Sequence, residues 1–217
     1  MAGVVLELWL VRHGETVWNA AGRVQGRSDP ELSETGCEQA RRLGSRLEHT
    51  AFTAVVSSDL QRAVQTAKLA LPDAPLQTDP RLRELDFGAW EGRTWGEVAA
   101  ADPEALTAWY ANPYVNAPTG GEGYAALVRR TRGWSESLPK SGRVLAFTHG
   151  GPIRGLLYTL TGVPDGHTWR FDPGPASLTK LTLGEYGAIL HTVGDVAHLE
   201  AAHLEAAHLE TPQLETS

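Results

Sequence analysis

The chain has 217 residues, of which 41% are hydrophobic and 21% charged, as expected for one globular domain with a sizeable core. Its net charge is −7 and its 19 lysines and arginines are dispersed, which argues against a nucleic acid or membrane partner. A single cysteine cannot form an internal disulfide, and neither a signal peptide nor a membrane-spanning run is recognisable. We therefore expect a cytoplasmic protein that acts on a small molecule, as a monomer or a homodimer.

The first part of the chain alternates strand patterns with helical ones. Residues 6–11 form an apolar run typical of a strand buried on both faces of a parallel sheet. Ser33 is expected to cap a helix whose apolar positions continue at helical spacing. Residues 55–56 predict a second strand, and either Ser58 or Asp59 is expected to open the next helix.

The second part of the chain completes a sheet. Residues from about 90 to 135, rich in Trp, Gly and Pro, predict a small irregular or helical cap. Residues 144–148 predict another buried strand, and 178–183 with 188–193 predict a terminal hairpin. The alternation predicts an α/β fold: a three-layer α/β/α sandwich with a mostly parallel, doubly wound sheet, forming one domain over residues 1–194.

Residues 195–217 form a low-complexity tail that repeats Ala-His-Leu-Glu-Ala. A five-residue period advances about 140° per repeat on a helix, so His198, His203 and His208 do not share a face. We interpret the tail as a helical or disordered solvated extension rather than a metal site.

Two predicted strands each end in a histidine followed by glycine. His13 follows the first strand, and His149 follows the strand at 144–148. Ligands of α/β sheets bind at the carboxyl ends of parallel strands, so we expect the two imidazoles to meet there. A lone strand-end histidine is more often a hydrogen-bonded structural group, so its neighbours decide the interpretation.

Those neighbours fit a phosphate pocket. Phosphoryl transfer to a side chain needs a nucleophile with a free lone pair, such as imidazole, and dense positive charge around the phosphoryl oxygens. Arg12 adjoins His13, and Arg62 falls in the first turn of a predicted helix, where free N–H groups favour an anion. Taken singly, Arg62 would be a solvated arginine and Asn19 a turn or cap residue. Asn19 and Gln25 offer amide donors, and the glycines after both histidines let the backbone approach a phosphate closely.

A leaving alkoxide also needs a proton, which a carboxylic acid held neutral near pH 7 can supply. Glu84 is the first candidate because apolar residues surround it in the sequence. Asp86 and Glu91 are close rivals, and the residues alone do not separate the three.

Together these motifs resemble the histidine phosphatase superfamily, also called the phosphoglycerate-mutase-like family. The resemblance runs from about residue 8 to the terminal hairpin and keeps the family's order of motifs. They are Arg12-His13-Gly14-Glu15-Thr16 with Trp18-Asn19, Ser57-Ser58-Asp59-Leu60-Gln61-Arg62, Leu82-Arg83-Glu84 with Phe87-Gly88 and Glu91-Gly92, and Thr148-His149-Gly150-Gly151.

The resemblance implies a role for each candidate residue. His13 becomes phosphohistidine, Glu84 rather than its rivals is the proton donor and later the base for water, and His149 binds phosphoryl oxygens. The remaining phosphate-binding residues are Arg12, Asn19, Gln25, Arg62 and Gly150. No metal and no cofactor are implied.

The family contains mutases as well as phosphatases. The segment between Glu84 and His149 lacks the basic insertion of the mutases and so leaves less lid to exclude water. Phe87 stands where mutases tend to carry Tyr. We therefore expect a phosphomonoester hydrolase similar to short bacterial broad-specificity and α-ribazole-5′-phosphate phosphatases, acting on a small phosphorylated metabolite. The alternative is a cofactor-dependent phosphoglycerate mutase. Four cap aromatics either line an apolar leaving-group pocket or, as we favour, pack the cap: Trp90, Trp95, Trp109 and Tyr110.

Other classes fit less well. A cysteine-dependent phosphatase needs an arginine at the sixth position after its nucleophile, and the residue there after Cys37 is Leu43. A metal hydrolase needs closely spaced ligands near strand ends, which the histidines lack. A non-catalytic phosphate-binding module remains as the second alternative, although every chemical role in the pocket is filled.

Overall fold

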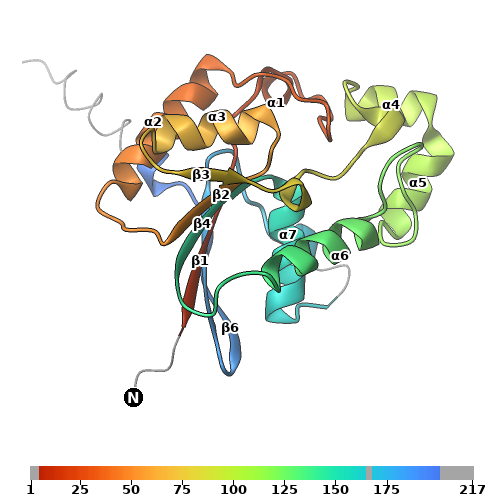
Figure 1. Cartoon of the computed structure of the whole chain (residues 1–217). Helices are drawn as coiled ribbons and strands as arrows, with labels where there is room; N and C mark the ends of the chain where they lie inside the picture. The colour runs from red at the N-terminus through yellow and green to blue at the C-terminus, as the bar shows by residue number, and fades with distance from the viewer. Residues whose placement is uncertain (1–4, 165–167, 201–217) are drawn as a thin grey trace, which may run out of the picture.

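The computed structural model describes residues 5–164 and 168–200. A six-stranded sheet in the order β3-β2-β4-β1-β5-β6 forms its centre (Figure 1). Four strands are parallel: β1 (Leu6–Arg12), β2 (Ala54–Ser57), β3 (Leu76–Thr78) and β4 (Gly142–Thr148). Strand β5 (Leu178–Gly184) pairs antiparallel with β1, and β6 (Gly187–Asp195) pairs antiparallel with β5 at the edge of the sheet. The predicted mostly parallel α/β fold is confirmed.

Helices cover both faces of the sheet (Figure 1). Helices α2 (Glu34–Leu47) and α3 (Gln61–Ala70) pack on one face, and α6 (Tyr124–Ser135) and α7 (Gly150–Thr161) pack on the other. Helices α4 (Trp95–Ala101) and α5 (Pro103–Ala111) lie away from the sheet, at the right of the figure. The remaining short elements are α1 (Val17–Ala20), η1 (Pro80–Leu82), η2 (Gly88–Trp90) and η3 (Thr168–Arg170).

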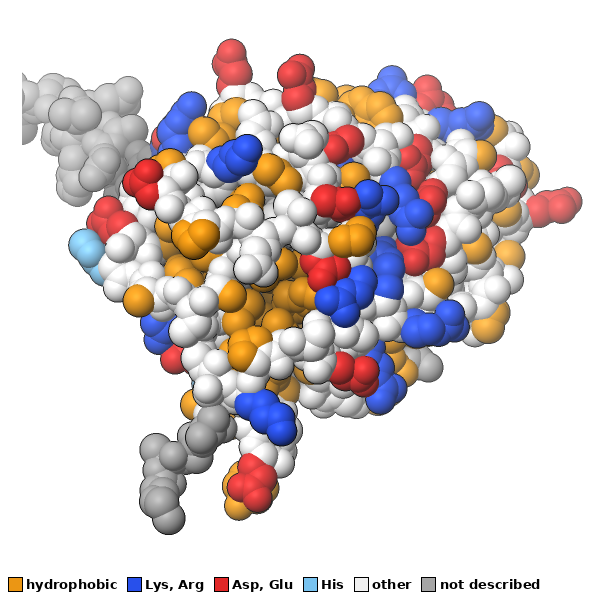
Figure 2. Space-filling view, viewed as in Figure 1, with side chains coloured by type: hydrophobic (Ala, Val, Ile, Leu, Met, Phe, Trp, Pro, Cys, Tyr) orange, Lys and Arg blue, Asp and Glu red, His pale blue; other side chains and the backbone are white. Residues whose placement is uncertain are grey.

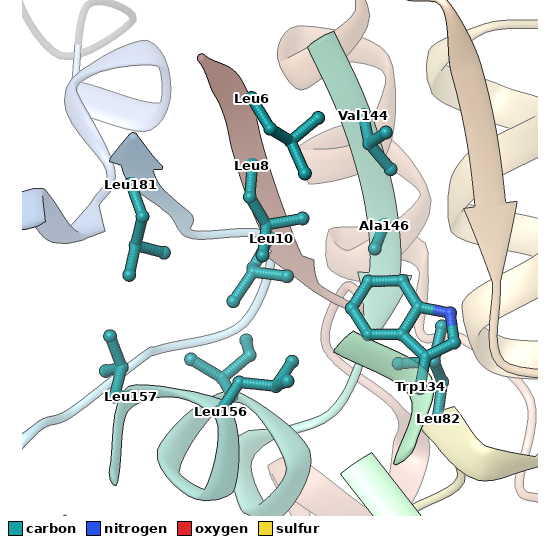
Figure 3. Close-up of a cluster of buried hydrophobic side chains, with 11 residues drawn as sticks. Leu6, Leu8, Leu10, Leu82, Trp134, Val144, Ala146, Leu156, Leu157 and Leu181 are labelled. Carbon is teal, nitrogen blue, oxygen red and sulfur yellow. The ribbon is translucent and has the colours of Figure 1, made fainter. Parts of the chain in front are cut away.

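The alternation of side chains along β1 builds two cores at once. Successive side chains of a strand point to opposite faces, so Leu8 and Leu10 pack towards Leu156 of α7 (Figure 3), whereas Val11 joins the cluster under α2 and α3 that contains Leu43. Burial on both faces explains why the predicted strand at residues 6–11 is almost wholly apolar. The two cores hold β1 and β4 in place, and thereby set the position of their carboxyl ends, Arg12 and Thr148.

The start of α3 differs from the prediction. Its N-cap is Leu60, which makes no side-chain cap bond, rather than Ser58 or Asp59. The Asp29 carboxylate, from a distant loop, accepts hydrogen bonds from the backbone N–H groups of Gln61 and Arg62 instead. A capping residue supplied from elsewhere in the chain leaves no local sequence signal. The predicted N-cap of α2 is confirmed, because the Ser33 hydroxyl accepts from Gly36 N–H at 3.0 Å.

A third cluster, around Trp90, Trp109 and Tyr124, joins α4, α5 and the first turns of α6. A small, largely helical cap therefore follows η2, whereas Trp134 at the end of α6 packs on the sheet. The predicted bounds of the cap, about 90–135, and of the domain, 1–194, stay predictions. Most of the tail predicted at 195–217, including His203 and His208, lies outside the described residues. No described helix is long and apolar enough to cross a bilayer. On the face shown in Figure 2, basic and acidic side chains are interspersed, with no large area of one sign.

Candidate active site

Two buried histidines lie together at the carboxyl edge of the sheet. Strands β1 and β4 pair in register, with Arg12 opposite Thr148, so both chains leave the sheet at the same level. The backbone N–H of His13 donates to the Thr148 carbonyl at 2.9 Å. The ring centroids of His13 and His149 are 5.1 Å apart, and both side chains are almost inaccessible. The structure thus brings together the two histidines that the sequence placed at strand ends.

The hydrogen bonds of the His13 ring define a neutral imidazole whose Nε2 carries no proton. Its Nδ1 lies 2.7 Å from the Gly14 carbonyl oxygen, which can only accept, so Nδ1 carries the proton. The other nitrogen, Nε2, accepts a hydrogen bond from the Nε–H of Arg62 at 3.3 Å, so its lone pair points towards the guanidinium. Burial, and then the charges of Arg62 and Arg12, lower the pKa of His13 well below its ordinary value.

The turn that presents His13 is fixed by residues that the sequence analysis did not single out. The Thr66 hydroxyl of α3 accepts from Gly14 N–H at 3.0 Å and donates to the Arg62 carbonyl at 2.7 Å. A Cβ on Gly14 would lie 2.5 Å from the Gly36 carbonyl oxygen, so the first turn of α2 packs directly on this backbone. Neither contact follows from local sequence, because both partners come from other helices.

Arg62 is fully buried and held on several sides. Its Nη1 and Nη2 each donate to a backbone carbonyl at 2.7 Å, those of Ser28 and Gly26, and Nη1 forms an ion pair with Asp29 at 3.3 Å. Burial lowers the pKa of Arg62, which the carboxylates of Glu84, Asp29 and Glu91 oppose. Guanidinium stays protonated in proteins, so a fixed positive charge adjoins the lone pair of His13.

Arg12 and the start of α7 add a second positive region. Arg12 Nη1 donates to the Pro173 carbonyl at 2.9 Å, whereas its Nε is buried without a hydrogen-bond partner among the described residues. A Cβ on Gly150 would lie 3.2 Å from Nη1 of Arg154 and 3.9 Å from Arg12. Glycine at the first position of α7 therefore allows guanidinium groups close to the positive end of the helix dipole.

His149 precedes α7 as its N-cap residue. Its Nε2 lies 2.8 Å from the Ser58 hydroxyl, and its Nδ1 is buried without a hydrogen-bond partner within the part of the chain described. The Ser58 oxygen accepts from Leu60 N–H at 3.3 Å and keeps both a proton and a second lone pair, so the tautomer of His149 decides the direction of its bond to Ser58. Burial and the charge of Arg62 lower the pKa of His149 well below its ordinary value. Ser58 was predicted as a helix cap, and its contact with His149 was not foreseen.

Glu84 lies against the start of α7, where its carboxylate contacts Gly151, two residues after His149. Its carboxylate accepts from the N–H of Gly151, in the first turn of α7, at 3.1 and 3.2 Å, and from its own neighbour Leu85 at 2.8 Å. Arg130 of α6 holds the backbone of this loop, because it donates to the carbonyls of Arg81, Arg83 and Glu84. Arg130 was not singled out from the sequence either.

The geometry separates Glu84 from its two rivals. Asp86 accepts from Gly88 N–H at 2.9 Å and forms an ion pair with Arg27 at 3.3 Å. Glu91 accepts four hydrogen bonds from loop backbone and a loop hydroxyl. Both carboxylates are thus committed to loop structure, whereas Glu84 adjoins the start of α7. The arrangement favours Glu84 as the acid, and its chemical role stays a prediction.

Asn19 and Gln25 are placed by the loop that follows His13. Asn19 forms a reciprocal capping box with Thr16 at the start of α1, so the simpler expectation of a cap residue accounts for its carbonyl oxygen. Gln25 accepts from the Thr16 hydroxyl at 2.9 Å through its own side-chain oxygen. Both amide NH₂ groups remain as donors, and a phosphate contact for either residue stays a prediction.

The aromatic residues of the cap divide into two groups. Trp90 and Trp109 are buried and pack edge to face with ring centroids 5.8 Å apart, which fits the favoured expectation of cap packing. Trp95 and Tyr110 expose 39% and 63% of their surface and lie against Trp109. A leaving-group pocket lined by these two rings stays a prediction.

No group of three or more His, Cys, Asp or Glu residues within the described ranges is arranged to hold a metal ion. A cavity of about 660 Å³ beside Val128, Arg132 and Leu160, at the far ends of α6 and α7, contains none of the candidate residues. The fixed charges at the histidine pair come from arginines and a helix terminus, an arrangement that binds anions.

Comparisons with known proteins identify the family to which this chain is similar. A family model described as the histidine phosphatase superfamily (branch 1) matches residues 8–196. A Yersinia pestis protein named "Probable phosphoglycerate mutase GpmB" is 36% identical over 212 residues, which cover 90% of this chain and 96% of that protein. The structure of Bacillus stearothermophilus YhfR is similar with a TM-score of 0.84 and 33% identity, covering 90% of this chain and 100% of that one. The Shigella flexneri alpha-ribazole phosphatase has a TM-score of 0.82 and 31% identity, covering 88% and 96% respectively.

Proposed function

The chain belongs to the histidine phosphatase superfamily, and we propose that it hydrolyses a phosphomonoester of a small metabolite through a phosphohistidine on His13, without a metal ion. One observation carries the proposal. A buried, neutral imidazole has its proton tied to the Gly14 carbonyl and its lone pair turned towards the Arg62 guanidinium. When a bound phosphoryl group takes over this hydrogen bond from Arg62, the same lone pair can attack phosphorus beside a fixed positive charge.

In the first step, Nε2 of His13 forms a bond to phosphorus as the bond from phosphorus to the ester oxygen breaks. The Glu84 carboxylic acid gives its proton to that oxygen, which leaves as an alcohol. The Nδ1–H bond to the Gly14 carbonyl stabilises the positive charge that develops on the ring. In the second step, Glu84 accepts a proton from water, the water oxygen attacks phosphorus, and the bond to Nε2 breaks. Inorganic phosphate leaves and the acid is restored.

The buried donors around the histidine pair bind the phosphoryl oxygens in this scheme. If the Ser58 hydroxyl donates to Nε2 of His149, the proton of that ring lies on Nδ1, the nitrogen that has no partner in the described structure. The unpartnered Nε–H of Arg12 supplies a second donor. Buried donors without partners are costly, and an anion that accepts from both removes this cost.

The proposal is tested by measuring phosphate release from a broad panel of phosphomonoesters, beside a phosphoglycerate mutase assay on the same preparation. We expect phosphate release that a metal chelator does not abolish and that His13→Ala removes. Loss of activity on chelation would contradict the metal-free mechanism. Transfer between the positions of phosphoglycerate without phosphate release would instead support the second candidate, a mutase, which the name of the Yersinia relative favours.

A further inference from the structure

The Glu91 carboxylate joins two loops that border the candidate active site. One oxygen accepts from the backbone N–H groups of Arg27, at 2.8 Å, and Phe87, at 3.0 Å. The other accepts from Ser28 N–H at 2.7 Å and from the Ser28 hydroxyl at 2.6 Å. A Cβ on Gly26 would lie 1.9 Å from the first oxygen, so the loop backbone packs directly on this carboxylate. The side chain is half-buried, and both of its carboxylate oxygens accept hydrogen bonds from the two loops.

The first loop, residues 26–29, is the one that orients Arg62. Its Gly26 and Ser28 carbonyls accept from the two Nη atoms at 2.7 Å each, and its Asp29 pairs with the same guanidinium at 3.3 Å. The carbonyl of Gly26 belongs to the same peptide unit as the N–H of Arg27, which Glu91 binds. Fixing that peptide plane therefore fixes one of the two acceptors that set the rotation of the guanidinium.

The second loop carries the candidate acid. Phe87, whose N–H Glu91 binds, lies three residues after Glu84. The next residue, Gly88, has a positive φ of 52° and its backbone packs against Thr119. Glu91 thereby links the loop that holds Arg62 to the loop that presents Glu84. Its negative charge also opposes the effect of burial on the pKa of Arg62.

We propose that Glu91 is a positioning residue, which sets the Arg62 guanidinium to receive the phosphoryl oxygens by fixing residues 26–29 against the loop of Glu84. The effect of Glu91 on catalysis rests on the proposed function. Its effect on the affinity of the site for inorganic phosphate does not, because that affinity can be measured without turnover.

The test compares Glu91→Gln with the wild-type protein and with Glu97→Gln. The amide keeps one acceptor oxygen but turns an NH₂ group towards backbone donors, so at least one of the loops loses its anchor. Glu97 is a matched control in the same cap, because it too accepts a backbone N–H, that of Thr94, but is exposed and contacts neither loop. Binding of inorganic phosphate is measured by titration calorimetry at a temperature well below each protein's unfolding midpoint.

We expect Glu91→Gln to weaken phosphate binding about tenfold, which corresponds to the free energy of one charge-assisted hydrogen bond. Glu97→Gln should leave the phosphate affinity unchanged. With an active enzyme, kcat/KM should fall together with the phosphate affinity. A folded Glu91→Gln protein with wild-type phosphate affinity would overturn the proposal.

A milder variant covers the case in which Glu91→Gln does not fold. Ser28→Ala removes only the hydroxyl bond to the carboxylate and should weaken phosphate binding about two- to threefold. Unchanged affinity in Ser28→Ala, with Glu91→Gln unfolded, would assign Glu91 to stability alone and also overturn the proposal. If the wild-type protein binds phosphate but hydrolyses no ester, the proposed function fails while the role of Glu91 is still decided by these affinities.

Discussion

Replacing Arg62 by lysine tests how far the fixed guanidinium is responsible for the chemistry. The wild-type side chain reaches two backbone carbonyls, Asp29 and the Nε2 atom of His13 at once, from a fully buried position. A single ammonium group cannot span the Gly26 and Ser28 carbonyls and also face His13. At least one buried, charge-assisted bond is lost, which corresponds to about 1.5–3 kcal/mol. In addition, the phosphoryl oxygens lose the Arg62 guanidinium as a preorganised hydrogen-bond donor.

Removing one preorganised donor from a site of this kind lowers the rate by about 100- to 1000-fold, and we expect a decrease of that size in kcat/KM for Arg62→Lys. The assay is initial-rate hydrolysis of p-nitrophenyl phosphate, with urea unfolding measured on the same preparations. Arg132→Lys is the matched control, because the Arg132 side chain forms an exposed pair with Glu136 and its replacement should change neither quantity appreciably. If Arg62→Lys retained kcat/KM within threefold of wild type, the assigned role of the guanidinium would be wrong.

Three further predictions follow from the same site. Ser58→Ala removes the hydrogen bond to His149 and should lower kcat/KM about 10- to 100-fold, and an unchanged value would mean that Ser58 does not set the His149 proton. Glu84→Gln should slow alkyl phosphates more than p-nitrophenyl phosphate, because p-nitrophenolate leaves without a proton; equal slowing of both would argue against the acid role. The lowered pKa values of His13 and His149 mean that the unfolded chain takes up protons below about pH 6.5 while the folded one does not, so the free energy of unfolding should fall as the pH drops through that range. Replacing His13 by glutamine should reduce this slope in urea unfolding at several pH values.

The sequence predicted the sheet and the meeting of the two histidines because both depend on local patterns. An apolar run ending in His-Gly marks β1 and β4, and the rule that ligands bind at the carboxyl ends of parallel strands brings their histidines together. The hairpin of β5 and β6 was recognisable from its glycines and apolar runs. By contrast, β3 has only three residues, none of them buried, so it leaves no pattern to detect.

The parts of the site that were not predicted depend on partners far apart in the chain. Asp29 caps α3 from a distant loop, and Thr66 anchors the backbone of Gly14. Arg130 holds the Glu84 loop through backbone carbonyls, which any sequence offers equally. Glu91 was considered only as a rival acid, because a carboxylate that binds backbone N–H groups has the same sequence appearance as one that transfers protons. Tertiary contact alone distinguishes these roles.

The most direct test of the central claim is to trap the phosphoryl group on the enzyme. Rapid mixing with a radiolabelled phosphomonoester, quenched in alkali within a single turnover, should give a labelled protein whose label is stable to base and released by acid, as expected for phosphohistidine. Peptide mapping should place the label on the segment that contains His13, and His13→Ala should show neither label nor turnover. Near-wild-type hydrolysis by His13→Ala, or a label on another residue, would contradict the mechanism.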